Sequence, residues 1–464
     1  TMNASYKNSL FVVIYKKKYP IKVISSNCLK KHPFDIQKKI FFRLHKEIIY
    51  IADSHEKLAI YGNYEISSES IYFYQSSGLI IPPSTIFKGI YIVPVGFKFC
   101  HANQDFILEK KIKCKGEGII DCLGKLIDDN YKYKNVNLLF SGGADSSLLL
   151  YLMRKHKPKL KIKSIFFNSG NLKDELKRAK KLAHILDSEL YEIVPRKEDP
   201  KVVKKFIIEQ TYNLKELIYE PILFTIDSIF KAIPDGGIVF DGQGADTVLG
   251  GLPHHLLIQI YSLKIVRLFA KLEIFSLFKK LFKPIRNKSR FYYRIYKLLT
   301  SLNEKKLSAC LINSLLSTDK SLKKNDIYFM QEKIINVFLN EYDEISTVSL
   351  FFLSILSSRE LQKYKLNNKL VYCLPYLDPE FIHYCLSISK DLKCKLNRRK
   401  IPIIDFLNKN LSLRFSSNQQ LPFEPHSSHV LSDIDNKNFD PLIKSKNVRD
   451  ISIRAMYKKY MRIN

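Results

Sequence analysis

The chain has 464 residues, carries 76 Lys and Arg against 45 Asp and Glu for a formal net charge of +31, and is 46% hydrophobic. So much apolar side chain excludes a disordered or low-complexity protein, and the length predicts two or three domains. The positive charge is compatible with nucleic acid, phosphate-rich ligands, an anionic membrane or an acidic peptide as partners.

The cysteines and the apolar segments indicate the cellular compartment in which we expect the chain. None of the eight cysteines forms a CxxC pair, and a chain of this length needs no disulfides, so we expect mostly buried thiols in a reducing cytoplasm. Thr1 before Met2 resembles a cloning remnant, which makes Met2 the expected native start. We find no N-terminal signal pattern and no uncharged run of about 18 apolar residues, so no transmembrane segment is expected.

Residues 1–117 are predicted to form a small β-rich domain. Four short segments rich in aromatic and β-branched residues favour strands, and turn residues separate them. These segments are SLFVVIY (9–15), EIIYIAD (47–53), LAIYGNYEI (58–66) and GIYIVPVGFKF (89–99).

Residues 118–464 are predicted to form a second domain of the α/β class. Apolar strand-like segments such as NVNLLF (135–140) and KIKSIFF (161–167) alternate with amphipathic helical segments up to about residue 252, and the chain then reads as mainly helical. Such alternation predicts parallel strands, crossover helices and a ligand site at the carboxyl ends of the strands.

The segment LLFSGGADSSLLLYLMRK (138–155) predicts an anion-binding loop. An apolar strand enters a turn with Gly142 and Gly143, and a helix follows directly. Glycines let the backbone approach a ligand, and amides and serine hydroxyls at the positive end of a helix favour phosphate. Asp145 within this loop is suited to Mg²⁺, which binds through one or two carboxylates and phosphate oxygens. A turn that merely starts a helix is the alternative.

A second Gly-rich turn, IVFDGQGADTVLGG (238–251), also follows a strand and carries Asp246. We expect Asp145 and Asp246 to lie at the ends of neighbouring strands and to share a Mg²⁺ ion that binds pyrophosphate. A purely structural turn is again the alternative.

Together the two motifs resemble the asparagine synthetase B and β-lactam synthetase family of N-type ATP pyrophosphatases, which carries SGGxDS and SGEGADELFGG. The segments at 72–99, 174–194 and 374–388 are also similar to that family, and the lasso-peptide macrolactam synthetases resemble the chain most closely. The resemblance implies a parallel-sheet PP-loop ATP pyrophosphatase domain with a helical C-terminal extension, after a degenerate Ntn-amidotransferase-like domain. It further implies ATP and Mg²⁺ as cofactors, AMP and pyrophosphate as products, and pyrophosphate binding by Ser141, Gly142, Gly143, Asp145, Ser146, Ser147, Gly242 and Gly244.

Departures from the family pattern bear on the source of the amine. Asn3 follows Met2 where glutamine-using relatives have a cysteine nucleophile, and the N-terminal region is short, so glutamine hydrolysis is not expected. We therefore expect intramolecular amide formation, giving a lactam or macrolactam. Ammonia-dependent amidation of an amino acid or a sugar acid stays open. The substrate would be a small molecule or a peptide, in the latter case with a leader-peptide-binding protein or a protease as partner.

Three further residues are candidates for catalysis. Gln243 stands where the resemblance places Glu, and it can orient a carboxylate or carbonyl but cannot act as a base. Lys400 in RRKIPIIDF, or Arg414 in LRFSSNQQLPFEP, could supply positive charge to the transition state. Both cations could equally be solvated surface residues.

Basic residues alternate with Leu, Ile and Phe between Lys264 and Lys297, and Glu273 is the only acid there. This pattern predicts amphipathic helices with a solvated lysine face, or a surface that docks an acidic peptide, a leader-binding partner or an anionic membrane.

We expect His254 and His255 to be loop or pocket residues and not metal ligands. Nucleic acid is not expected as a partner because no RNA-binding module is recognisable, and a tRNA-modifying PP-loop enzyme and a nucleotide-binding pseudoenzyme remain alternatives.

Overall fold

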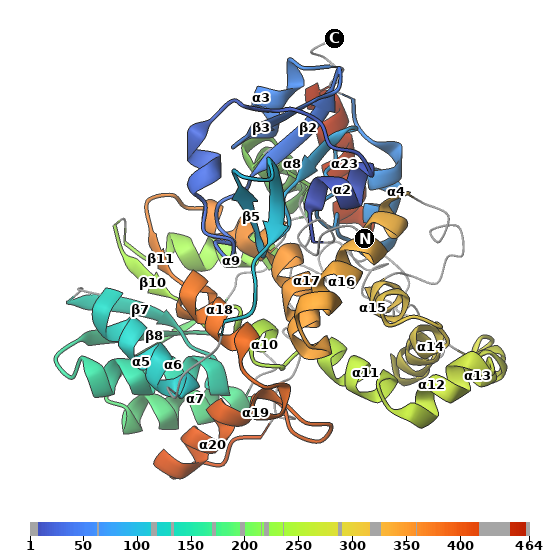
Figure 1. The fold of residues 1–464 in the computed structure, drawn as a ribbon. Coiled ribbons are helices and arrows are strands. Elements are labelled where there is room, and N and C mark those ends of the chain that lie inside the picture. The colour runs from blue at the N-terminus through green and yellow to red at the C-terminus, as the bar shows by residue number, and fades with distance from the viewer. Residues whose placement is uncertain are drawn as a thin grey trace.

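The computed structural model places most of the chain (Figure 1). The residues that it describes are 8–62, 65–112, 118–130, 134–168, 173–194, 200–214, 216–217, 222–234, 236–285, 290–315, 326–358, 360–416 and 446–460.

A five-stranded parallel sheet forms the centre of the C-terminal part, as the alternating pattern predicts. Its strands, in the order β11-β10-β7-β8-β9, are all parallel to their neighbours. The order reverses between β7 and β10, and a ligand crevice is expected where the strand order of an open α/β sheet reverses. The strands are β7 (Asn135–Leu139), β8 (Lys161–Phe167), β9 (Glu189–Ile193), β10 (Ile238–Phe240) and β11 (Val371–Cys373).

Helices connect these strands and cover the sheet. The helix α6 buries Leu148, Leu149 and Leu150 completely, and α7 does the same with Ala179 and Leu182, so their apolar sides form the core against the strands. The connecting helices are α5 (Ile119–Asn130), α6 (Ala144–His156), α7 (Lys173–Ile185), α8 (Pro200–Leu214), α9 (Ile222–Lys231) and the short α10 (Ala245–Val248).

From residue 252 onward most of the described residues lie in helices, apart from the edge strand β11. The α-helices of this region are α11 (Pro253–Tyr261), α12 (Lys264–Lys271), α13 (Ile274–Phe282), α14 (Arg290–Leu302), α15 (Leu307–Leu315), α16 (Asp326–Glu341), α17 (Glu344–Ser358), α18 (Pro379–Ser387), α19 (Lys390–Lys393), α20 (Ile401–Asn410) and α23 (Lys446–Tyr460). Two 3₁₀ helices, η3 (Glu360–Lys365) and η4 (Pro375–Leu377), flank β11.

The N-terminal part contains a four-stranded sheet and a hairpin. The sheet has the order β1-β3-β2-β4, in which β1 and β3 are parallel and the other pairs antiparallel. Its strands are β1 (Ile21–Val23), β2 (Phe41–His45), β3 (Ile48–Ala52) and β4 (Ile90–Ile92), and the hairpin pairs β5 (Phe97–Cys100) with β6 (Asp105–Leu108). Helices α3 (His55–Ala59) and α4 (Ser68–Ser77) and the 3₁₀ helix η1 (Ser26–Lys30) lie between strands.

Two of the four segments expected to be strands are not strands. Residues 10–15 form the helix α2 (Leu10–Tyr15), whose start is held by Ser9 and by the carboxylate of Asp105, which accepts the Phe11 amide at 3.1 Å. Burial of Leu10 and Phe11 in the core outweighs the strand preference of the β-branched run. In the segment 58–66, Leu58 belongs to α3 and a turn follows at 60–62, while residues 63 and 64 lie outside the described residues.

The N-terminal sheet and the parallel sheet share one hydrophobic core. Phe42 and Ile51 belong to the same buried cluster as Leu138 and Leu148. The C-terminal helix α23 also packs against α8 and α4 (Figure 1), where Nη1 of the buried Arg449 donates to the carbonyl of Gln75 at 2.6 Å. The predicted boundary at 117 falls outside the described residues. None of the described helices has the length and hydropathy needed to cross a bilayer.

Candidate active site

The two Gly-rich loops lie side by side at the point where the strand order reverses. Strands β7 and β10 are neighbours, with Leu138 opposite Phe240, so both loops emerge at the same edge of the sheet. A Cβ atom on Gly242 would lie 3.3 Å from the Cβ of Asp145, which leaves little room for a larger residue between the loops. Gly244 adopts a φ of +97°, a conformation that L-residues rarely adopt. The structure therefore brings Asp145 and Asp246 together from positions far apart in the sequence.

The first loop is organised by its own serines around the N-terminus of α6. The Gly143 amide donates to the hydroxyl of Ser141 at 3.2 Å, and the hydroxyl of Ser146 lies 3.4 Å from that of Ser141. Among the described residues, the buried hydroxyl of Ser147 finds no hydrogen-bond partner. Tyr376 of η4 donates to the carbonyl of Asp145 at 3.0 Å and so anchors the first turn. The arrangement presents the positive end of a helix to an anion.

The ammonium group of Lys400 lies between the two carboxylates. Its Nζ atom is 2.6 Å from Oδ2 of Asp145 and 2.7 Å from Oδ1 of Asp246. Burial lowers the pKa of Lys400, but the carboxylates of Asp145 and Asp246 outweigh this effect and the pKa is raised, so the side chain stays charged at neutral pH. Lys400 also caps α20 with a φ of +51°, a strained conformation for a residue with a side chain. Such strain is common at functional sites.

The same carboxylates have the chemistry of a magnesium site. Oxygen ligands suit Mg²⁺, and the Asp246 side chain, 39% exposed, can be reached from solvent. Among the described residues no three His, Cys, Asp or Glu side chains converge, so phosphate oxygens and water would have to complete the coordination. The donor set fits a Mg²⁺ ion bound together with a polyphosphate, with Lys400 as the neighbouring cation.

A cationic pocket opens beside the α6 N-terminus. Arg178 lies with its guanidinium 4.4 Å from the ring centroid of Phe415, and Nη1 of Arg399 donates to the carbonyl of Gly251 at 3.1 Å. Together with Lys400 these two arginines give the pocket three cations around one exposed carboxylate, as an anionic ligand with a metal ion requires. The pocket is lined by Gly143, Ala144, Arg178, Asp246, Gly251, Arg399, Lys400, Ile404, Phe415 and Ser416.

Of the two residues that the sequence offers as the catalytic cation, Lys400 lies in the site and Arg414 does not. Lys400 is buried between the acids, whereas Arg414 is exposed and does not line the pocket, although its neighbours Phe415 and Ser416 do. Arg178 and Arg399 were missed. Arg399 precedes Lys400 in the RRK motif and could have been proposed with it, but no local pattern singles out Arg178.

Gln243 belongs to a hydrogen-bonded group on the other side of the second loop. Its side-chain Oε1 accepts from Nζ of Lys363 at 2.9 Å, and the same Nζ lies 2.8 Å from Oδ2 of Asp241. The hydroxyl of Tyr364 donates to that carboxylate oxygen at 2.6 Å. Sequence reasoning did not find Lys363 or Tyr364, because they lie on η3, more than a hundred residues away. The group fixes the orientation of the Gln243 amide.

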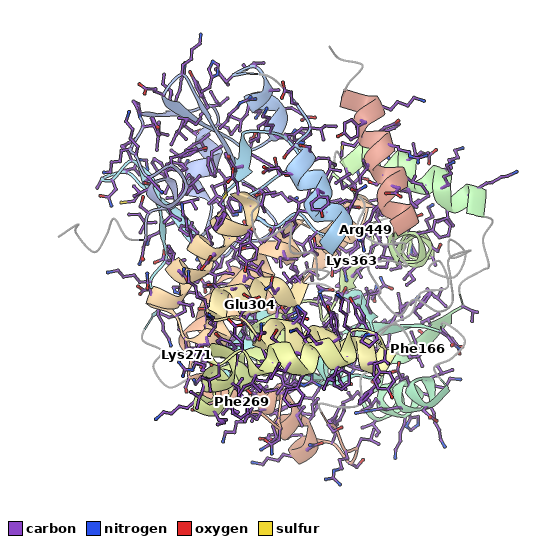
Figure 2. All side chains as sticks on the ribbon, turned by 90° about the vertical axis from the view of Figure 1, so that its right-hand side faces the viewer. Phe166, Phe269, Lys271, Glu304, Lys363 and Arg449 are labelled. Carbon is purple, nitrogen blue, oxygen red and sulfur yellow. The ribbon has the colours of Figure 1, made fainter. Side chains whose placement is uncertain are left out.

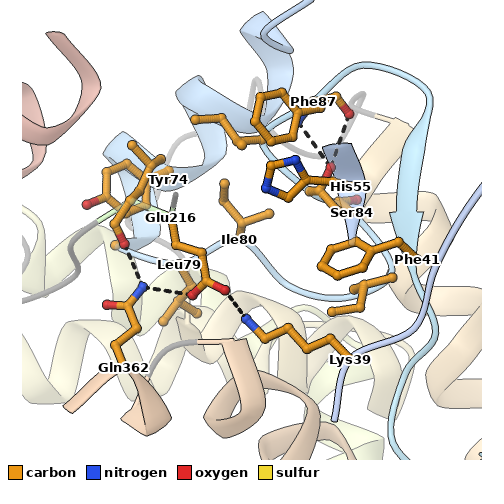
Figure 3. Close-up of a pocket in the computed structure, with 15 residues that line it drawn as sticks. Lys39, Phe41, His55, Tyr74, Leu79, Ile80, Ser84, Phe87, Glu216 and Gln362 are labelled. Atoms are coloured by element: carbon orange, nitrogen blue, oxygen red, sulfur yellow. Dashed lines mark hydrogen bonds and ion pairs between the residues drawn. The ribbon is translucent and has the colours of Figure 1, made fainter. Parts of the chain in front are cut away.

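A second pocket lies under the N-terminal sheet (Figure 3). It has about 650 Å³ of empty space, part of it open to solvent, and its walls include Phe41, His55 and Phe87. At its base Glu216 pairs with Lys39, and Gln362 donates to Glu216 at 3.2 Å. Burial raises the pKa of Glu216, but Lys39 and Lys365 outweigh this effect and hold it at about 2.

The two adjacent histidines after the second loop occupy the start of α11. The buried His255 accepts the Leu252 amide at Nδ1, at 3.1 Å, and its Nε2 lies 3.1 Å from the hydroxyl of Ser349. Burial, together with Lys393 and His254, holds the pKa of His255 well below its ordinary value, so the ring is neutral. Because both ring nitrogens are engaged by protein groups, His255 stabilises this turn.

Comparison with protein-family models identifies the family of the chain. A family model described as asparagine synthase matches residues 132–411, which include the parallel sheet, both loops and Lys400. No curated protein matches the chain.

Proposed function

The chain belongs to the asparagine synthase family of ATP-dependent C–N ligases, and we propose that it forms AMP and pyrophosphate by activating a substrate carboxylate as an adenylate. The observation that carries the proposal is the Lys400 ammonium, which contacts Asp145 and Asp246 beside the N-terminus of α6. A polyphosphate needs an anion-binding helix end, several cations and carboxylates for a metal ion, and this pocket combines them.

In the proposed reaction a carboxylate oxygen of the substrate attacks the α-phosphorus of ATP, and the bond from that phosphorus to the bridging oxygen breaks. The Ser141–Ser147 loop and the α6 amides hold the leaving pyrophosphate, and Arg178 and Arg399 balance its charge. Lys400 is placed to stabilise the negative charge that develops on the pentavalent phosphorus. Mg²⁺, bound by Asp145, Asp246 and phosphate oxygens, would add charge neutralisation and orientation.

In the second step an amine attacks the carbonyl carbon of the adenylate, AMP leaves with the bonding electron pair, and the amine loses a proton. We propose that this amine belongs to the substrate itself, so that the product is a lactam or macrolactam. For a peptide substrate, a leader-peptide-binding protein or a protease is the expected partner. Gln243, whose Oε1 accepts from Lys363, would orient the reacting carboxylate or carbonyl.

Three of the buried cysteines are unsuited to be the nucleophile of glutamine hydrolysis. Burial raises the pKa of Cys373 to about 12 and that of Cys394 to about 11, and it also raises the pKa of Cys310. A nucleophilic cysteine needs the opposite shift, because the thiolate is the reactive form. Free ammonia remains the second candidate. Mass spectrometry of the product separates the two, since cyclisation removes one water whereas amidation replaces a hydroxyl by an amino group.

The test is the exchange of labelled pyrophosphate into ATP in the presence of Mg²⁺ and pools of carboxylates. We expect carboxylate-dependent exchange for the wild-type chain and its loss in Asp145→Asn and Asp246→Asn. Asp187→Asn, at a solvent-exposed carboxylate paired with Arg154, is the matched control and should exchange normally. Normal exchange in both Asp145→Asn and Asp246→Asn would remove these residues from the site.

A further inference from the structure

Helices α12, α13 and α14 form a lobe that projects to one side of the molecule, at the right in Figure 1. Apolar side chains on this lobe are unusually exposed: Leu272 is 62% accessible, Leu281 69% and Phe291 66%. Exposed apolar patches of soluble proteins commonly mark interaction sites. The lobe therefore has the character of an interaction surface.

The exposed apolar residues of α12 form a stripe that the fold does not use. Ile265, Leu268 and the C-cap residue Leu272 recur at helical spacing and are all exposed, whereas the core contacts of α12 come from Ala270 and Val266. At about 100° per residue these two sets lie on different sides of the helix. The exposed stripe is thus additional to the apolar side that holds α12 in place.

The neighbouring helix α13 repeats the arrangement. Leu277, Phe278 and Leu281 are exposed at helical spacing, while Phe275 packs against the core cluster and its ring lies 6.1 Å from that of Phe269. Further along, α14 adds the exposed Phe291. One lobe therefore presents leucine and phenylalanine side chains from three consecutive helices.

Basic side chains lie on the same helices as the exposed stripes. On α12 they are Lys264, Arg267 and Lys271, and around α13 they are Lys279, Lys280 and Lys283. Figure 2 views the molecule from the side of this lobe, with Phe269 and Lys271 labelled on it. In the described part of 263–298 the only acid is Glu273, which pairs with Lys305 at 3.2 Å. The surface combines apolar and positively charged groups without compensating carboxylates.

We propose that the lobe α12–α14 docks on an anionic membrane surface, with its helices lying in the interface and not crossing the bilayer. Two interactions hold interfacial helices on membranes: apolar side chains enter the lipid boundary, and lysines attract acidic headgroups. Nucleic acid would use the lysines but not Leu277 or Leu281. A second copy of the chain would place like charges opposite one another. This inference does not depend on the proposed reaction.

Vesicle flotation tests the proposal with the full chain and without ATP. Vesicles that contain phosphatidylglycerol should carry the wild-type protein, and vesicles of phosphatidylcholine alone should carry much less. Leu277→Ser with Leu281→Ser, and separately Lys264→Gln with Lys271→Gln, should each lower the partition coefficient at least about tenfold. The control Ile60→Ser with Leu392→Ser changes equally exposed apolar residues outside the lobe and should have no effect.

A fluorescence reporter gives an independent readout, because the chain contains no tryptophan. Leu281→Trp should show a blue shift of its emission when anionic vesicles are added, and Leu392→Trp should not. Equal shifts at both positions, or no binding to anionic vesicles, would overturn the proposal. So would self-association that the leucine changes abolish, or binding of an acidic polypeptide without binding of vesicles.

Discussion

The substitution Lys400→Met removes the cation between Asp145 and Asp246 while keeping most of the side-chain volume. At an effective dielectric constant of about 20, each of the contacts at 2.6 and 2.7 Å corresponds to about 6 kcal/mol of Coulomb attraction. Desolvation offsets most of this energy, and breaking a buried pair costs about 3–5 kcal/mol. Because the Asp246 side chain is 39% exposed, we expect the lower end, a loss of about 3 kcal/mol.

The pH dependence has a definite sign. Because the pKa of Lys400 is raised above the ordinary 10.5, its contribution to stability is complete at neutral pH. The contribution is lost only as the pH rises through the raised value. A difference in stability between the wild-type chain and Lys400→Met should therefore be constant from pH 6 to 9, about one unit or more below the ordinary lysine pKa.

The effect of Mg²⁺ on the free energy of unfolding distinguishes a structural role of Lys400 from a role at the metal site. In Lys400→Met the two carboxylates face one another without their ammonium, so Mg²⁺ should bind them and recover about 2–3 kcal/mol at concentrations near 100-fold its Kd. The wild-type chain should gain less, because its Lys400 already neutralises the pair. Catalytic turnover should nevertheless fall by about 100- to 1000-fold.

The assay is chemical denaturation with and without Mg²⁺, followed by turnover measurements. The matched control is Lys393→Met, another buried lysine, which donates to the Ser346 hydroxyl and to the carbonyl of Cys385. Its variant should be destabilised but should gain no more from Mg²⁺ than the wild-type chain does. Equal gains in the two variants, or an unchanged stability of Lys400→Met, would refute the reasoning.

Three further predictions concern the surroundings of the site. In Gly251→Ala the new Cβ would overlap Asp246 and crowd Lys400, so ATP binding measured by calorimetry should be lost, whereas Gly118→Ala, which meets only the mobile end of Asp121, should bind normally. Because the pKa of His255 is lowered, the unfolded chain takes up a proton near the ordinary value of 6.5 that the folded chain does not. Stability should therefore fall below that pH by up to about 1.4 kcal/mol per pH unit, and His255→Gln should reduce this slope in denaturation curves at pH 7 and pH 5; an unchanged slope would contradict the assignment. Lys363→Met removes the ammonium that donates to Oε1 of Gln243 and should lower kcat for the carboxylate more than it raises KM for ATP, and the opposite split in steady-state kinetics would place Lys363 at the nucleotide instead.

The sequence predicts the parallel sheet and the two loops because their signals are local. The alternation around β7 and β8 and the glycines beside Asp145 are visible within a few residues, and parallel strands bring their ends to one edge. The helix at 10–15 was mispredicted, because burial of its leucine and phenylalanine decides its conformation and not the preference of its β-branched residues.

The site residues that the sequence does not identify depend on long-range contacts. Lys400 and Arg414 are indistinguishable as sequence candidates, and only the fold places Lys400 next to Asp145, which lies 255 positions earlier in the chain. Lys363 and Tyr364 carry no motif, because their role depends on η3 packing beside the second loop. Arg178 likewise reaches the pocket only through the position of α7.

The central claim concerns which phosphate bond of ATP is cleaved, and the products of turnover test it most directly. ATP labelled at the α- and γ-phosphates is incubated with Mg²⁺, the wild-type chain and pooled amino acids, sugar acids and peptides, and the products are separated. The account predicts AMP and pyrophosphate in equal amounts, formed only with a carboxylate and about 100- to 1000-fold more slowly in Lys400→Met. Carboxylate-dependent formation of ADP and phosphate would contradict it.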